Sequence, residues 1–193
     1  MLRTILLCLL IPLDFALAFG QESVTQPLED SKPTTMFPAS WLGRWQGEVE
    51  SQSPAGGSMK FKMSLEIRES DSPDQVTWTI LYQGEQGESE RKYLLKAVDP
   101  KKGHFVIDEQ NGILLDAVLI NNCLSTHFSV QQQRLWSTYR LQTSDSGPEI
   151  HFELFTASEG DVTTTGGKDG VPEVQTLKTQ SRQFAVLRLQ KRS

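Results

Sequence analysis

The sequence predicts an all-β fold, a closed antiparallel up-and-down barrel of about ten strands. Short runs in which apolar and polar side chains alternate follow one another along most of the chain, and this alternation is typical of half-buried strands. Gly, Pro, Asn and Asp separate the runs at short intervals, so consecutive strands are expected to pair as hairpins. Because about ten twisted strands in an open sheet would leave two edges exposed, closure into a barrel is favoured. A two-sheet β-sandwich is the alternative.

Two segments show the alternation most clearly. In residues 59–68 the odd-numbered side chains are apolar and the even-numbered ones are polar, so the two sets lie on opposite faces of a strand. Residues 76–82 repeat the pattern. The other predicted strands cover residues 41–50, 91–98, 104–109, 112–120, 123–130, 134–142, 149–156 and 181–190.

Two connections differ from the short turns between the other strands. Asn111-Gly112 tolerates the positive φ angles of a type I′ turn, which makes it the strongest hairpin signal in the chain. The segment 157–180, with Gly166-Gly167 and few apolar residues, is predicted to be a long flexible loop, with disorder favoured over a lid. Its end, near Val174 and Leu177, is also compatible with an extended strand.

The first residues have the features of an export signal. Arg3 precedes an apolar run over residues 5–17, and Ala16-Leu17-Ala18 supplies the small-x-small pattern that signal peptidase reads. The run is shorter than the roughly 20 apolar residues that a spanning helix needs. We therefore expect residues 1–18 to be a cleaved signal peptide, and the mature chain to be secreted or periplasmic without stable membrane insertion. An uncleaved anchor is the alternative.

Cleavage would leave a leader and one domain. Residues 19–38 are rich in Gln, Glu, Ser, Thr and Pro and are predicted to be a flexible leader, followed by the barrel domain over residues 39–193. Because Cys8 lies in the signal peptide, Cys123 is the single cysteine left and no internal disulfide is expected. The net charge is −5 and no cluster of Lys and Arg interleaves with aromatic residues, so nucleic acid is a poor candidate partner.

The opening strand carries a family resemblance. Trp41–Glu48 resembles the first strand of the calycin barrels, and Gly43-Arg44-Trp45 matches the G-x-W element of lipocalins. In that group the Trp closes one end of the barrel and a basic residue near the chain end packs over it, so the resemblance implies that Gly43, Trp45 and Arg188 close the barrel. With Gly47, the pattern also resembles nitrobindin-like and fatty-acid-binding-like proteins, which share a ten-stranded barrel.

The resemblance implies a small molecule held in the barrel, although this chain departs from the relatives in two ways. Nitrobindins bind haem through a His near the end of the barrel, whereas no His follows His151 here, so haem and other cofactors are not expected. Secreted lipocalins usually carry disulfides, which this chain cannot form once Cys8 is removed.

The candidate ligand wall is the apolar face of the two clearest strands. Met and aromatic side chains make adaptable walls for apolar ligands, and a ten-stranded barrel encloses more volume than its own side chains readily fill. The alternative is that this face is simply packed core. The predicted ligand-binding residues are Met59, Phe61, Met63, Leu65, Trp78 and Tyr82.

The histidines and hydroxyl groups give little support to catalysis or metal binding. His104, His127 and His151 lie on three different predicted strands, and nothing in their spacing requires them to converge, so no metal site is expected. Cys123 and Ser125 share one strand face with His127. A polar exterior is the favoured interpretation of that face, and a polar patch on a cavity wall is the sharper alternative.

Two carboxylates could form an acid and base pair. Asp116 lies within an apolar run and Glu153 precedes the long predicted loop. Pairing of Asp116 with Arg134 or Arg140 on a neighbouring strand is favoured over a catalytic role.

These observations predict an exported, non-catalytic protein that binds a small apolar or amphipathic molecule inside a β-barrel. The first alternative is an interaction module with a solid barrel core, whose protein partner contacts the outer face. An enzyme of unknown reaction is the third possibility. The sequence leaves the ligand and the oligomeric state open.

Overall fold

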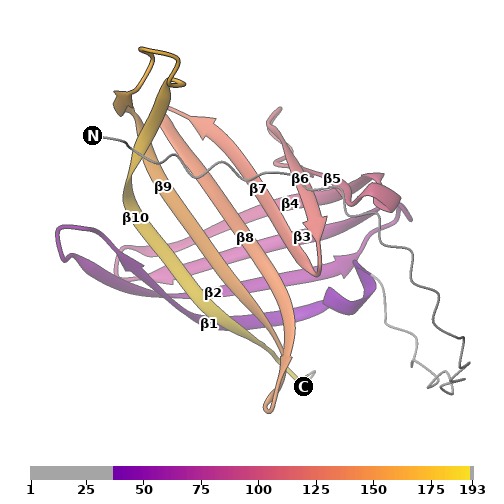
Figure 1. Cartoon of the computed structure of the whole chain (residues 1–193). Coiled ribbons are helices and arrows are strands. Elements are labelled where there is room, and N and C mark those ends of the chain that lie inside the picture. The colour runs from indigo at the N-terminus through magenta and orange to yellow at the C-terminus, as the bar shows by residue number, and fades with distance from the viewer. Residues whose placement is uncertain (1–36, 192–193) are drawn as a thin grey trace, which may run out of the picture. The chain divides into compact units, whose positions relative to one another are not determined.

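The computed structural model describes residues 37–191, which form a closed ten-stranded antiparallel barrel (Figure 1). Each strand pairs with its neighbours in the chain, and the last strand pairs with the first, so the order around the barrel is β1-β10-β9-β8-β7-β6-β5-β4-β3-β2. This is the up-and-down barrel that the sequence predicts, and the β-sandwich alternative is wrong. The predicted signal peptide over residues 1–18 and the leader up to residue 36 lie outside the described residues.

The strands follow the predicted alternations closely. Two short 3-10 helices, η1 (Ala39–Trp41) and η2 (Pro100–Lys102), accompany them, and no helix within residues 37–191 has the length and apolar character to cross a membrane. The strands are β1 (Gly43–Gln52), β2 (Ser58–Glu69), β3 (Gln75–Gly84), β4 (Gly87–Asp99), β5 (His104–Asp108), β6 (Leu114–Ile120), β7 (Cys123–Val130), β8 (Gln133–Ser144), β9 (Gly147–Thr165) and β10 (Val174–Leu189).

One end of the barrel is closed by tryptophans. Trp45 at the start of β1 is buried, and its indole N–H donates a 2.8 Å hydrogen bond to the carbonyl oxygen of Trp41 in η1. Trp41 is fully buried, meets Phe37 edge to face at 5.2 Å between ring centroids, and lies 6.2 Å from the ring of Trp78. Phe37 in turn meets Phe105 edge to face at 4.8 Å. We call this group of five aromatic residues the aromatic plug.

Arg188 does not pack over Trp45, and this corrects the closure that the resemblance implies. Side chains alternate along β10, so Leu187 points inward and is fully buried, whereas Arg188 points outward and is exposed. Arg188 lies opposite Gln46, one residue out of register with Trp45. The backbone of Trp41, not a basic side chain, therefore holds the indole of Trp45.

The turn at Asn111-Gly112 is wider than predicted. Residues 109–113 connect β5 and β6, with a 3.0 Å hydrogen bond from the N–H of Glu109 to the carbonyl of Ile113. Positive φ occurs at Gln110 and Gly112 but not at Asn111, so a two-residue type I′ turn is wrong here. Two-residue turns with positive φ at both positions occur instead at Asn121-Asn122 and Gln131-Gln132.

The segment 157–180 is mainly strand, so the prediction of a long loop is wrong. β9 continues to Thr165 and β10 starts at Val174, which leaves only residues 166–173 as a connection. Thr and Val favour extended backbone, and Lys178 and Asp161 form a 2.9 Å ion pair between the two strands. The pairing of Leu177 with Val162 confirms that this part extends a strand. The hairpin rises beyond the neighbouring strands in Figure 1.

Candidate functional site

A cavity of about 1450 Å³ lies inside the barrel. It opens at the end opposite the aromatic plug, because residues of the β3–β4 turn and the β7–β8 turn, including Glu85 and Gln131, form part of its lining. Its volume exceeds the roughly 300–1,000 Å³ of most ligand pockets. The barrel interior is therefore not filled by its own side chains.

Aromatic side chains form part of the deeper wall, together with aliphatic ones. Trp78 on β3 and Tyr139 on β8 meet edge to face at 5.1 Å between ring centroids, and Tyr139 lies 5.0 Å from Phe152 on β9. Nearer the mouth, Phe61 on β2 meets Tyr82 edge to face at 5.8 Å. These contacts fix the rings in place and leave their remaining faces toward the cavity.

Four of the six predicted ligand residues line this cavity and two do not. Met59, Phe61, Trp78 and Tyr82 are part of the lining, with Met59 at the mouth and 58% exposed. Met63 and Leu65 point inward as well but are fully packed in the core. The difference follows from the direction of β2, which runs from the open end of the barrel toward the aromatic plug.

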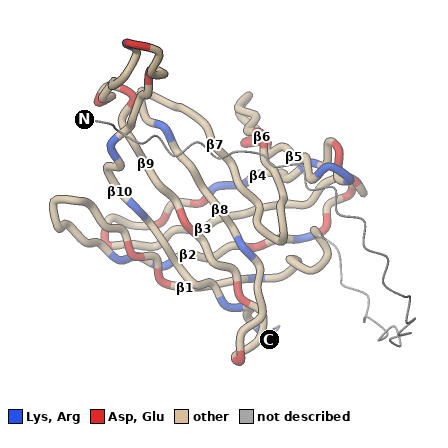
Figure 2. Tube along the Cα trace, in the orientation of Figure 1, with Lys and Arg blue, Asp and Glu red and all other residues tan. Residues whose placement is uncertain are grey.

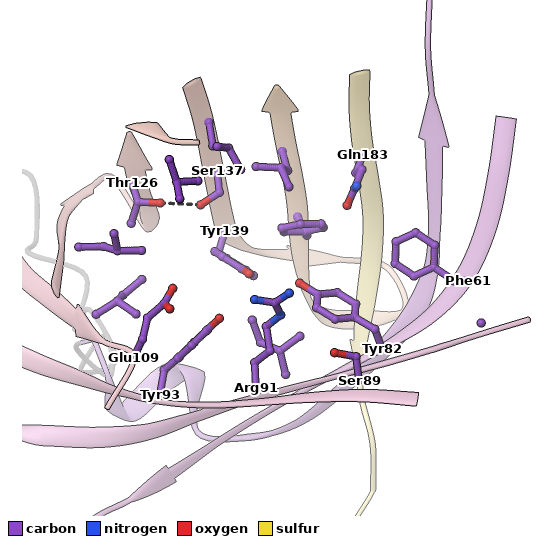
Figure 3. Close-up of a pocket in the computed structure, with 18 of the residues that line it drawn as sticks. Phe61, Tyr82, Ser89, Arg91, Tyr93, Glu109, Thr126, Ser137, Tyr139 and Gln183 are labelled. Carbon is purple, nitrogen blue, oxygen red and sulfur yellow. Dashed lines mark hydrogen bonds between the residues drawn. The ribbon is translucent and has the colours of Figure 1, made fainter. Parts of the chain in front are cut away.

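A charged residue that sequence reasoning missed lies on the cavity wall. Figure 3 shows Arg91 of β4 pointing into the cavity, next to Tyr82 and Tyr93 and facing Tyr139 across it. The Tyr93 side chain, as the largest cause, raises the pKa of the Arg91 guanidinium. Arg91 shares a strand face with Tyr93 and Leu95, but its own charge and the polar residues before it did not suggest an interior position.

The phenols around Arg91 hold their protons. Burial raises the pKa of Tyr82 to about 12, and it raises the pKa of Tyr139 well above its usual value. At neutral pH both hydroxyl groups therefore remain available as hydrogen-bond donors.

The opposite wall carries small polar groups. Thr126 on β7 and Ser137 on β8 share a 2.7 Å hydrogen bond between their hydroxyl oxygens, and Gln183 of β10 also lines the cavity (Figure 3). The cavity thus combines aromatic walls, one guanidinium and a few hydroxyl and amide groups, with the charged side chains of Lys60, Glu85 and Glu109 also in its lining.

The other residues weighed for chemistry lie on the outer surface. On β7, Leu124 and Thr126 point inward, so Cys123, Ser125 and His127 point outward, and the His127 ring lies 6.3 Å from the ring of Trp136. His104 is exposed, and His151 Nε2 lies 2.8 Å from the Glu149 carboxylate, which accepts the hydrogen bond, on the outer face of β9. Among residues 37–191 no group of three or more His, Cys, Asp or Glu side chains is placed to hold a metal ion.

The two candidate carboxylates are also on the outside and do not pair with each other. Asp116 is exposed and forms no ion pair with Arg134 or Arg140. Arg134 instead pairs with Glu159 at 3.2 Å. The predicted partnership of Asp116 is therefore wrong. Glu153 pairs with Arg182 at 2.6 Å, since it alternates with inward-facing Phe152. Figure 2 shows acidic and basic residues interspersed along the strands.

Comparison with known proteins supports the fold. No family model and no curated protein matches the sequence. The structure is similar to that of the S-type phycobiliprotein lyase CPES from Guillardia theta, with a TM-score of 0.52 and 8% sequence identity over 79% of this chain and 89% of the other. At this identity the similarity shows a shared barrel fold.

Proposed function

We propose that this protein is exported and binds a small apolar or amphipathic molecule in the barrel cavity without converting it chemically. The observation that carries the proposal is the cavity of about 1450 Å³ with its aromatic wall. A solid-core interaction module would fill this volume with side chains. The similar solved structure is that of a phycobiliprotein lyase, so a barrel of this kind occurs in a protein of that name.

The position of the titratable groups favours binding over catalysis. A hydrolytic or acid–base site needs a base within hydrogen-bond reach of a nucleophile or substrate. The hydroxyls of Thr126 and Ser137 bond to each other, while His104, His127 and His151 belong to the outer face of the wall. The carboxylates in the cavity lining, Glu85 and Glu109, form no hydrogen bond with a hydroxyl or histidine side chain of residues 37–191.

Binding of a neutral apolar dye tests the proposal. N-phenyl-1-naphthylamine is expected to show saturable fluorescence enhancement with the wild-type protein, because the cavity removes it from water. A double variant, Ser89→Trp with Ser137→Trp, introduces two indoles from opposite walls and is expected to weaken dye binding at least about tenfold, or ~1.4 kcal/mol.

The matched control places the same two indoles outside the barrel. Glu90→Trp with Thr138→Trp changes the next residue on each strand, which points outward, and should leave dye affinity unchanged. Circular dichroism and thermal melts confirm folding of both variants. Equal weakening by the inner and outer pairs would place the dye outside the cavity, and absence of any enhancement with the wild type would refute the proposal.

Export is tested at the chain terminus. Because Ala16-Leu17-Ala18 follows an apolar run, mature protein collected from its own host is expected to begin at or near Phe19. Intact-mass analysis and N-terminal sequencing measure this directly. A collected chain that still begins at Met1 would contradict cleavage, and retention of the protein in the cytoplasm would contradict export.

A further inference from the structure

Two basic side chains line the cavity, Lys60 at the mouth and Arg91 on the wall, and they differ in whether a carboxylate pairs with them. Lys60 is neutralised by a 2.8 Å ion pair with Glu48. Arg91 forms no ion pair with a carboxylate anywhere in residues 37–191, whereas Arg134 and Arg182 on the outer surface each have one.

The nearest acidic group does not replace such a partner. Glu109 lines the cavity close to Tyr93 (Figure 3), and its charge favours the Arg91 cation, but the two side chains form no ion pair. Its carboxylate accepts a 3.3 Å hydrogen bond from the side-chain amide of Asn111, within the β5–β6 connection. The guanidinium has five N–H groups, so beyond its interaction with Tyr93 it has donors available for a ligand.

The side chains around Arg91 include hydroxyl groups that can donate hydrogen bonds to a ligand. Protonated phenols of Tyr82 and Tyr139 point into the same part of the cavity from opposite walls, with Tyr93 beside the guanidinium (Figure 3). The Arg91 guanidinium is exposed to the open cavity, and together with several O–H donors it favours an oxyanion, because charge-assisted hydrogen bonds are about twice as strong as neutral ones. A planar carboxylate matches the two parallel N–H groups that an arginine offers.

We propose that the ligand is an amphipathic carboxylic acid whose single carboxylate binds Arg91 and the Tyr82 and Tyr93 hydroxyls, with its apolar body along the aromatic wall. This inference rests on the proposed function and names the ligand class of the same cavity. Glu85 at the mouth and Glu109 beside the site repel a second negative charge. The cavity therefore selects monoanions over dianions such as alkyl phosphates.

Displacement of N-phenyl-1-naphthylamine at pH 7.5 tests this selectivity with three competitors of equal chain length: dodecanoate, dodecanol and dodecyl phosphate. With the wild type, dodecanoate is expected to displace the dye at about tenfold lower concentration than either of the others. In Arg91→Met, which keeps an unbranched apolar stem but removes the charge, dodecanoate should weaken about 10- to 100-fold, since hydrogen bonds to a charged group are lost. Arg91→Lys should fall between the two.

Lys92→Met is the matched control, because it removes one positive charge from the adjacent, outward-facing position of the same strand. It should leave all three competitors unchanged. Retained dye affinity in each variant reports an intact cavity. If the dye binds but dodecanoate and dodecanol compete equally, or Arg91→Met has no effect on dodecanoate, the carboxylate inference is overturned while the proposed function stands. Equal competition by dodecyl phosphate would overturn the selection of monoanions. Failure of the wild type to bind the dye would instead refute the proposed function itself.

Discussion

Replacing Trp41 by alanine is expected to lower the free energy of unfolding by about 3–5 kcal/mol, the usual cost of truncating a buried aromatic side chain. Trp41 is fully buried and contacts Phe37 and Trp78, so its removal leaves a cavity at the centre of the aromatic plug. A domain of ordinary stability has a free energy of unfolding of about 5–15 kcal/mol, so this loss would remove a large part of it. Urea denaturation followed by circular dichroism measures the change.

Two further variants separate packing from the presence of tryptophan itself. Trp136→Ala removes the same side chain from the outer face, where it is 55% exposed, and should cost less than about 1 kcal/mol. Trp41→Phe should also cost little, because the buried indole N–H of Trp41 has no hydrogen-bond partner among the described residues. An unpaired buried donor costs about 1–3 kcal/mol, which its removal recovers. Similar losses for Trp41→Ala and Trp136→Ala would show that the plug is not packed in solution.

Much of the barrel could be predicted because its strands have one apolar face. In β2 and β3 the period of two reports directly which side chains meet the core, and Trp78 and Tyr82 were assigned to the interior for that reason. The same rule assigned Cys123, Ser125 and His127 to the outer face. Strand number and short connections then favoured closure.

The missed features are those that a simple apolar and polar alternation does not signal. Arg91 is in phase with Tyr93 and Leu95, but a charged side chain at the end of an apolar face does not show that this face borders a large cavity. Trp41 precedes β1 and reaches the core through a 3-10 turn, so its burial does not follow from strand alternation. Residues 157–180 are exposed on both faces of the hairpin, so the composition of this segment resembles that of a loop. Its backbone is nevertheless mostly paired as strand.

The cavity and the plug are linked by shared residues. Trp78 contacts Trp41 on one side and Tyr139 on the other, and it also lines the cavity. The aromatic plug therefore closes the cavity at its inner end, and the aromatic wall packs directly against it. We infer that the barrel holds a ligand near its open half because the packed half fixes the rings that the ligand would contact.

Closure of the barrel depends on the seam between β1 and β10, and Gly47 is its tightest point. Pairing across the seam includes Gln46 with Arg188 and Glu50 with Phe184, and Gly47 lies between these pairs. A Cβ atom at Gly47 would lie 2.3 Å from the carbonyl oxygen of Val186 and 3.0 Å from a Leu187 methyl group. Because the first of these is a backbone atom, no side-chain rotation relieves the clash.

Gly47→Ala is therefore expected to destabilise the protein by about 1–3 kcal/mol through overpacking at the seam. Gly160→Ala is the matched control, since the nearest atom to its added Cβ, the Ser158 hydroxyl oxygen, is 3.6 Å away. There the substitution should be neutral or stabilise by up to about 1 kcal/mol, because alanine restricts the unfolded chain. Urea denaturation gives both values, and hydrogen exchange should show faster opening of β1 and β10 amides in Gly47→Ala alone. Changes of the same sign and size at the two glycines would mean that β1 and β10 do not approach as closely as a closed barrel requires.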